Sequence, residues 1–238
     1  MIGANGSAPG RSAAGEEDLF SLDLGKGPAI VLLHDASASA AVWAPFLPLL
    51  QGRFRVVAPD LPAARGDEQA RTVQELLDHL QVDRYAVVGH GAGGSIAQAL
   101  ALEDERVDAM VLLGATRLDD RPVDELRASL GAISFPVLLL WGEDDAVSPA
   151  TMGEALNDAM PSSTLGLLPG CGHDLLVEAA ETIGPMIAEY LRARFLHEPH
   201  GHEQKDGVVL LQLERRPPWV ELAEDEADDW YDVGDEED

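Results

Sequence analysis

The sequence predicts an α/β fold, in which a doubly wound and mostly parallel sheet carries helices on both faces. Short apolar runs alternate with helical patterns six times between about residues 18 and 197. Several of these runs are apolar without interruption, which is typical of parallel strands that are buried on both faces. Strand and helix alternating at this spacing indicate a doubly wound sheet.

The strand and helix segments can be assigned in chain order from these patterns. The expected strands are Ala29–Leu33, Phe54–Ala58, Tyr85–Val88, Ala109–Leu113, Val137–Trp141 and Thr164–Leu168. The expected helices are Ala40–Leu50, Thr72–Leu80, Gly93–Leu102, Pro122–Leu130, Pro149–Met160 and Thr182–Leu196. Ligands of open sheets bind outside the carboxyl ends of the strands, so a site is expected in the loops that follow them.

Three parts of the chain differ in composition. Residues 1–17 are rich in Gly, Ala and Ser without periodicity, which indicates a disordered lead-in. Residues 18–197 carry the strand and helix patterns and are expected to form the folded domain. Residues 198–238 hold 15 acidic and 3 basic residues, and we expect an acidic, disordered C-terminal tail because like charges repel one another.

Composition excludes several classes of function. The net charge of −27 disfavours nucleic acid as a partner, because phosphate backbones are bound by clustered cations. No apolar run approaches the ~18 residues that span a bilayer, and the first residues lack the apolar stretch of a signal peptide. The single cysteine, Cys171, excludes an internal disulfide framework and a cysteine-rich zinc site. A soluble, cytoplasmic protein is expected, with no membrane partner.

The segment Gly89–Gly94, GHGAGG, follows an apolar run and leads directly into a helical pattern. A strand, a sharp turn of small residues and a helix form the context of a nucleophile elbow, whose pattern is G-x-S-x-G. The residue at the nucleophile position is Gly91, which has no side chain. The glycines lack the G-x-G-x-x-G spacing and acidic partner of a dinucleotide site, and no cofactor or metal is predicted.

Five segments resemble the α/β-hydrolase family, and they follow one another in the family's order. They are AIVLLHDAS (29–37), RVVAPDLP (55–62), VVGHGAGG (87–94), PVLLLWGEDDAVSP (136–149) and PGCGHDLLVE (169–178). The resemblance extends over most of residues 18–197. It implies that Asp145 is the acid and His173 the base of a catalytic triad whose nucleophile position, Gly91, is vacant. The oxyanion and ligand-lining positions that it implies are His34, Asp35, Ala36, His90 and Ala92.

Two further features depart from the family's pattern. Asp35 stands where the family has glycine, and a carboxylate there would raise the energy of a nearby oxyanion unless it points away or is neutral. Only residues 114–136 separate two successive strands where the family often inserts a cap, so the lid is expected to be absent or minimal. Ser95, Ser37, Ser39 and Cys171 are candidate replacements for the missing nucleophile, but helix packing, turn formation and burial are the favoured explanations of these residues.

Three hypotheses of function remain open from the sequence. In the first, His173 and Asp145 act as a general base without an acyl-enzyme, in a hydrolase, lyase or related reaction on a small apolar ester, lactone or carbonyl compound. In the second, the chain is a non-catalytic pseudo-hydrolase that binds a small apolar ligand, or a protein partner through its acidic tail. In the third, it is a serine esterase whose nucleophile has been mutated.

Overall fold

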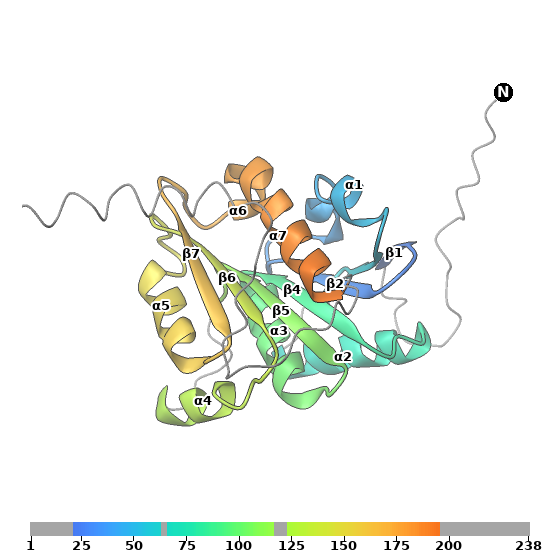
Figure 1. The fold of residues 1–238 in the computed structure, drawn as a ribbon, viewed down its shortest axis with the longest axis horizontal. Coiled ribbons are helices and arrows are strands. Elements are labelled where there is room, and N and C mark those ends of the chain that lie inside the picture. Colours follow the sequence, from blue (N-terminus) through green and yellow to red (C-terminus); the bar gives the residue numbers. More distant parts are fainter. Residues whose placement is uncertain (1–20, 63–65, 117–122, 196–238) are drawn as a thin grey trace, which may run out of the picture. The chain divides into compact units, whose positions relative to one another are not determined.

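One seven-stranded sheet organises the computed structural model, which describes residues 21–62, 66–116 and 123–195 (Figure 1). The strand order is β1-β3-β2-β4-β5-β6-β7, and all neighbours are parallel except β1, which is antiparallel to β3. The strands are β1 (Ser21–Gly25), β2 (Ala29–Leu33), β3 (Arg55–Pro59), β4 (Tyr85–His90), β5 (Val107–Leu113), β6 (Val137–Gly142) and β7 (Ser163–Leu168). The doubly wound, mostly parallel sheet that the sequence predicts is therefore confirmed.

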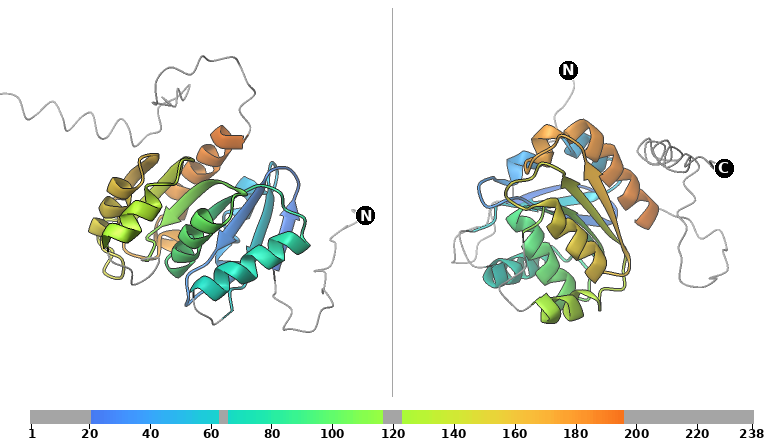
Figure 2. Two further views of the ribbon diagram at one scale, coloured as in Figure 1. Left: turned by 90° about the horizontal axis from the view of Figure 1, so that it is seen from below. Right: turned by 90° about the vertical axis from the view of Figure 1, so that its left-hand side faces the viewer.

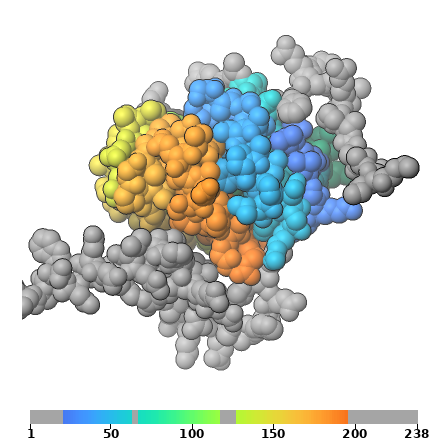
Figure 3. All heavy atoms as spheres, turned by 90° about the horizontal axis from the view of Figure 1, so that it is seen from above, coloured from blue at the N-terminus to red at the C-terminus, as the bar shows by residue number. Residues whose placement is uncertain are grey.

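Helices cover both faces of the sheet (Figure 2). The helices on one face are α2 (Gly66–His79), α3 (Ala92–Glu103), α4 (Val123–Leu130) and α5 (Ala150–Ala159). The elements on the other face are a 3-10 helix η1 (Ala40–Trp43), α1 (Leu47–Leu50), α6 (Leu175–Glu178) and α7 (Ala180–Phe195). On that second face α1 and α7 pack side by side, as Figure 3 shows in blue and orange.

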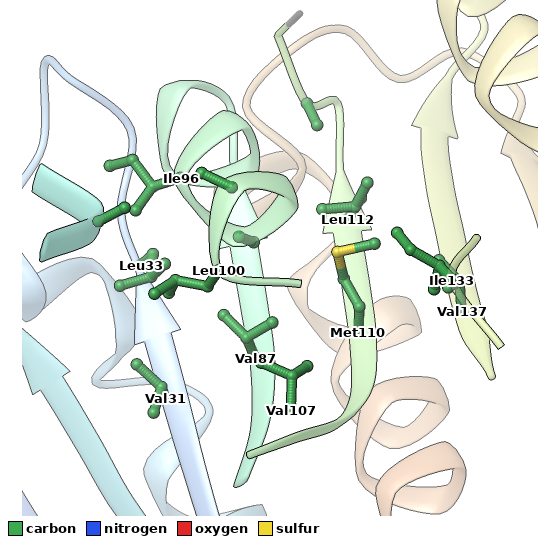
Figure 4. Packing of buried hydrophobic residues seen from close by; sticks show 14 of the residues in the cluster. Val31, Leu33, Val87, Ile96, Leu100, Val107, Met110, Leu112, Ile133 and Val137 are labelled. Atoms are coloured by element: carbon green, nitrogen blue, oxygen red, sulfur yellow. The ribbon is translucent and has the colours of Figure 1, made fainter. Parts of the chain in front are cut away.

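The apolar strands are buried on both sides, which explains why they show no alternation of polar and apolar residues. In β2, Val31 and Leu33 face the cluster beneath α3, while Ile30 and Leu32 face the cluster beneath α1 and α7. Figure 4 shows Ile96 of α3 together with Leu33 and neighbouring strand residues in the first cluster.

Several element boundaries differ from the sequence prediction. The predicted helix Ala40–Leu50 is two short helices, η1 and α1. Pro48 lies in the first turn of α1, where its missing N–H leaves no intrahelical bond unmade. The strand β1 and the single turn α6 were not predicted. β1 is a half-exposed edge strand, so it lacks the continuous apolar run of the central strands.

The sequence predicts that a lid between β5 and β6 is absent or minimal. Within the described residues this segment contains one helix, α4.

The predictions for residues 1–17 and 198–238 lie outside the described residues. None of the helices in the described ranges is long and apolar enough to cross a bilayer.

Glycines let the β4–α3 turn pack against its neighbours. A Cβ on Gly93, in the first turn of α3, would lie 2.3 Å from the carbonyl oxygen of Leu33 in β2. A Cβ on Gly89 in β4 would lie 2.4 Å from the carbonyl oxygen of Gly93. Both contacts are with backbone atoms, which cannot rotate away. The turn and the end of β2 are therefore held closer together than any other residue at these positions would allow.

Replacement of Gly93 by alanine should destabilise the fold, because the new methyl group would push α3 away from β2. We expect Gly93→Ala to lower the free energy of unfolding by about 1–3 kcal/mol, measured by urea denaturation. The matched control is Gly52→Ala, because no heavy atom lies within 4 Å of a Cβ built at Gly52. Equal stabilities of the two variants would contradict this account of the turn.

Candidate active site

His173 and Asp145 meet at the carboxyl ends of β6 and β7. Asp145 follows β6, and His173 lies in the loop between β7 and α6. His173 Nδ1 lies 2.8 Å from Asp145 Oδ2, and the Asp145 side chain is completely buried. The amides of Val147 and Ser148 donate to the other carboxylate oxygen, Oδ1, over 2.8 and 2.7 Å. Both oxygens of Asp145 are thus held, and the carboxylate has a fixed direction.

This arrangement determines which nitrogen of His173 can accept a proton. When Nδ1–H donates to Asp145, the lone pair of the neutral ring is on Nε2. The His173 side chain is 18% exposed, so the ring is within reach of small molecules. A carboxylate that orients an imidazole in this way forms a general-base pair, which needs no serine to remove a proton from water. The pair that the sequence predicts is therefore assembled in the structure.

Gly91 lies in the sharp turn between β4 and α3. Its φ of 54° and ψ of −120° belong to a region that residues with a side chain rarely adopt. The Gly91 amide donates to the Leu113 carbonyl, and the Gly91 carbonyl accepts from the amides of Gly94 and Thr116, each over 3.0 Å. The backbone of a nucleophile elbow is thus present, and its central residue carries no side chain.

The Asp35 carboxylate occupies the space beside Gly91. Asp35 follows β2, and its Oδ1 accepts a hydrogen bond of 2.7 Å from the Ala92 amide. A Cβ built on Gly91 would lie only 2.1 Å from that same oxygen. Asp35 Oδ2 accepts from the hydroxyl of Ser37 over 3.1 Å. The carboxylate therefore points into the elbow rather than away from it.

Asp35 is ionised at neutral pH. Burial by itself would raise the pKa of this carboxyl group, but the hydrogen bonds from the Ala92 amide, the Ser37 hydroxyl and the amides of Ala36 and Ser37 together bring the pKa below its ordinary value. Among the described residues, no cation forms an ion pair with Asp35. The Ala92 amide, which would stabilise a substrate oxyanion in an acyl-transfer enzyme, is here bound to an anion of the protein itself.

The remaining predicted lining residues have different surroundings. His34 is buried, and its two ring nitrogens contact backbone: Nδ1 donates to the Asp35 carbonyl over 2.7 Å, and Nε2 accepts from the Leu61 amide over 2.9 Å. These bonds tie the loop after β2 to the loop after β3. Ala36 is exposed beside Asp35. His34 thus holds the loop that carries Asp35.

His90 contacts the backbone of His173. Its Nε2 donates to the His173 carbonyl oxygen over 2.9 Å, and the centroids of the two rings are 5.3 Å apart. His90 Nδ1 is buried without a hydrogen-bond partner in the structure. Burial lowers the pKa of His90 below its ordinary value, which keeps the ring neutral at pH 7. His90 therefore supports the backbone of His173.

Gly114 is a part of the site that the sequence analysis did not single out. It follows β5 with a φ of 48°, and a Cβ there would lie 3.0 Å from Asp145 Oδ2 and 3.4 Å from His173 Nδ1. Only glycine leaves room for the pair at this point. The preceding residue, Leu113, accepts the Gly91 amide, so Gly114 also joins the base to the elbow. A glycine directly after an apolar strand was the available signal.

The other candidate nucleophiles have structural roles. Ser95 Oγ donates to the Ala92 carbonyl within α3 over 2.7 Å, and Ser37 Oγ donates to Asp35. Burial raises the pKa of the Cys171 thiol, which disfavours the reactive thiolate. The described residues contain no group of three or more His, Cys, Asp or Glu side chains that could hold a metal ion.

Two family models match consecutive parts of the chain. The model described as alpha/beta hydrolase fold matches residues 28–130, and a model described as TAP-like protein matches residues 112–201. Together the two matches span residues 28–201, so they cover most of the folded part of the chain. The chain belongs to the α/β-hydrolase fold family.

Several curated and solved proteins are similar to the chain. A 2-hydroxy-6-oxononadienedioate/2-hydroxy-6-oxononatrienedioate hydrolase of Pseudomonas putida is 26% identical over 79% of this chain and 97% of its own length. A pimeloyl-[acyl-carrier protein] methyl ester esterase of Nitrosomonas europaea is 26% identical over 63% of this chain and 90% of its own length. Among structures, a meta-cleavage product hydrolase from Pseudomonas fluorescens matches with a TM-score of 0.67 and 20% identity, over 74% of this chain and 94% of its own.

The first match also shows a difference in length. It spans 278 residues, whereas 79% of this 238-residue chain is about 190 residues, so about 90 positions of the match have no counterpart here. This chain is therefore shorter than that relative within the matched region.

A serine introduced at the elbow should not by itself create a serine esterase. The Cβ of Gly91→Ser would collide with Asp35, whereas the double variant Gly91→Ser/Asp35→Gly frees both the space and the Ala92 amide. We expect the double variant to hydrolyse short-chain aryl esters at least ~10³-fold faster than Gly91→Ser alone, since a nucleophile and oxyanion donor together contribute more than that. Asp35→Gly alone is the control, and equal rates of the single and double serine variants would show that Asp35 does not block the elbow.

Buried His90 should make the fold sensitive to mild acid. The unfolded chain takes up a proton on this ring near pH 6.5, and the folded chain only at a lower pH, because the folded pKa is lowered. As the pH falls from 7.5 through 6.5, the unfolded state binds more protons and the free energy of unfolding decreases until the pH passes the folded pKa. Urea denaturation at several pH values should show a larger decrease for the wild type than for His90→Asn. An identical pH dependence in the two proteins would rule out this role of His90.

Proposed function

We propose that this chain is a hydrolase that works without a nucleophile at the elbow and uses His173, oriented by Asp145, as the general base that activates water. The observation that carries the proposal is the 2.8 Å contact between His173 Nδ1 and Asp145 Oδ2, with both Asp145 oxygens held. The relatives that act on small molecules, such as the dienedioate hydrolase and the methyl ester esterase, support a small-molecule substrate.

The charge of the site narrows the substrate class. Asp35 adds a negative charge next to the elbow, and the whole chain carries −27. An anionic substrate would be repelled at such a site, whereas a neutral one would not. We infer a small neutral substrate with a hydrolysable bond, from the class of esters, lactones and related compounds.

The general-base proposal can be tested with substitutions at the pair. Hydrolysis of a panel of small neutral esters and lactones releases acid, so a single pH-indicator assay follows all of them. We expect His173→Ala and Asp145→Asn to lose at least a hundredfold in rate, which is the lower limit for a general base. Asp144→Asn is the matched control because Asp144 is the exposed neighbour of Asp145 and should retain full activity. Turnover that survives in His173→Ala would overturn the proposal.

A second candidate is a pseudo-hydrolase that binds a small apolar ligand, or a protein partner through the acidic tail. The observation in its favour is that Asp35 already occupies the Ala92 amide, which removes the oxyanion donor for a substrate carbonyl. This hypothesis predicts no turnover of any panel compound. It also predicts that deletion of residues 198–238 weakens binding of a protein partner, whereas His173→Ala does not.

The third hypothesis, a serine esterase whose nucleophile has been mutated, is disfavoured by the fit of Asp35 beside Gly91, since a lone Ser-to-Gly change would not supply the carboxylate.

A further inference from the structure

We propose that Glu178 is a positioning residue for the general base: it holds the peptide units on both sides of His173 and thereby keeps the imidazole on Asp145. Glu178 is the last residue of the short helix α6, which follows the loop of the base. The consequence for the rate rests on the proposed function, in which His173 activates water. The consequence for the position of the ring does not, so the two can be tested separately.

The two oxygens of the Glu178 carboxylate bind two different amides. Oε2 accepts a hydrogen bond of 2.6 Å from the Gly172 amide, and Oε1 accepts one of 3.2 Å from the Asp174 amide. These two residues immediately precede and follow His173. The Glu178 side chain therefore bridges the backbone on either side of the base.

The backbone of Glu178 is placed for this bridge by the turn of α6. Its own amide donates to the Asp174 carbonyl over 2.9 Å, so the side chain starts from a fixed point beside the loop. Glu178 is exposed as a residue, but its carboxylate lies directly against the loop: a Cβ built on Gly172 would be 3.2 and 3.3 Å from the two carboxylate oxygens. The glycine before the base thus leaves room for the carboxylate.

The carbonyl groups of the same loop are held by other elements. The Cys171 carbonyl accepts from the Asp144 amide over 3.0 Å, which ties the loop of the base to the loop of the acid. The His173 carbonyl accepts from the ring of His90 over 2.9 Å. These contacts fix the loop from the side of β4 and β6, whereas two of its amides are bound by Glu178. Loss of Glu178 would therefore release the loop on one side only.

The hydrogen bond between the base and the acid is sensitive to a shift of this loop. Asp145 is held by the amides of its own loop, so it cannot follow a displacement of His173. The contact of 2.8 Å between the two side chains is lost when they separate by about 1 Å. The His173 side chain is 18% exposed, so packing covers only part of it. The direction of the ring thus depends on where the backbone of residue 173 is held.

The bridge requires a carboxylate because two N–H donors need two acceptors. A glutamine at position 178 offers one acceptor oxygen and turns its own N–H donors toward the second amide. Glu178→Gln is therefore expected to lose at least one of the two hydrogen bonds, and Glu178→Ala loses both. The matched control is Glu181→Gln, which removes the same charge at the start of α7, beyond the loop of the base.

The test observes the Nδ1 proton of His173 by nuclear magnetic resonance, in the full-length protein with isotope-labelled histidine. In the wild type we expect a slowly exchanging signal, protected by Asp145 and assigned by its loss in His173→Ala. The signal should be broadened or lost in Glu178→Gln and Glu178→Ala, and retained in Glu181→Gln. Amide hydrogen exchange at Gly172 and Asp174 gives a readout that does not depend on the ring, and it should be at least ~tenfold faster in Glu178→Ala.

The rate gives a third readout in the assay with neutral esters and lactones. We expect Glu178→Gln to lower kcat at least ~tenfold with little change in KM, because a displacement of about 1 Å can cost on the order of a hundredfold in rate while substrate binding is left in place. Glu181→Gln should keep the wild-type kcat. Urea denaturation verifies that each variant is folded under the conditions of the assay.

The outcomes separate this inference from the proposed function. A wild-type Nδ1 signal and wild-type amide exchange in Glu178→Ala would overturn the positioning role, whatever the rate. The same changes in Glu181→Gln as in Glu178→Gln would also overturn it, because they would be an effect of charge alone. Absence of turnover in every protein, with the changes at the ring and the two amides as expected, would overturn the proposed function and support the positioning role.

Discussion

The hydrogen bond from the Ala92 amide to Asp35 is the contact on which the chemistry of this site depends. It is possible only because Gly91 has no side chain, since a Cβ there would overlap the carboxylate oxygen. The same bond helps to keep Asp35 ionised, and it takes up the backbone donor that an acyl-transfer enzyme reserves for its substrate. Residues 35 and 91 are therefore a coupled pair, and neither can be understood as a separate departure from the family.

The turn that presents this pair depends on close backbone packing. Gly89 and Gly93 let α3 approach β4 and the end of β2 to distances that a methyl group would prevent. His34 fixes the loop after β2 through hydrogen bonds from both ring nitrogens to backbone. The position of Asp35 thus results from two sheet-edge loops that are tied together, and not from the flexibility of one side chain.

The base is held by a different set of contacts. Asp145 is oriented by two amides of its own loop, and His173 is supported from below by His90 and given room by Gly114. None of these contacts involves residue 91. The order of the His173–Asp145 pair therefore does not depend on a side chain at residue 91, and the carboxylate of Asp35 from the neighbouring loop supplies the charge at the turn.

The sequence by itself predicted the central strands of the sheet and the elbow with Gly91, because continuous apolar strands and the short motifs after them are local patterns. The resemblance to the family implied the Asp145–His173 pair. It also marked Asp35 as unusual, but it left open whether the carboxylate points toward the site or away from it. Only the tertiary structure decided this, because the answer depends on the distance between the loop after β2 and the turn after β4, which are 57 positions apart in the chain. The same holds for Gly114 and for β1, whose roles come from contacts with distant segments rather than from any pattern in their own residues.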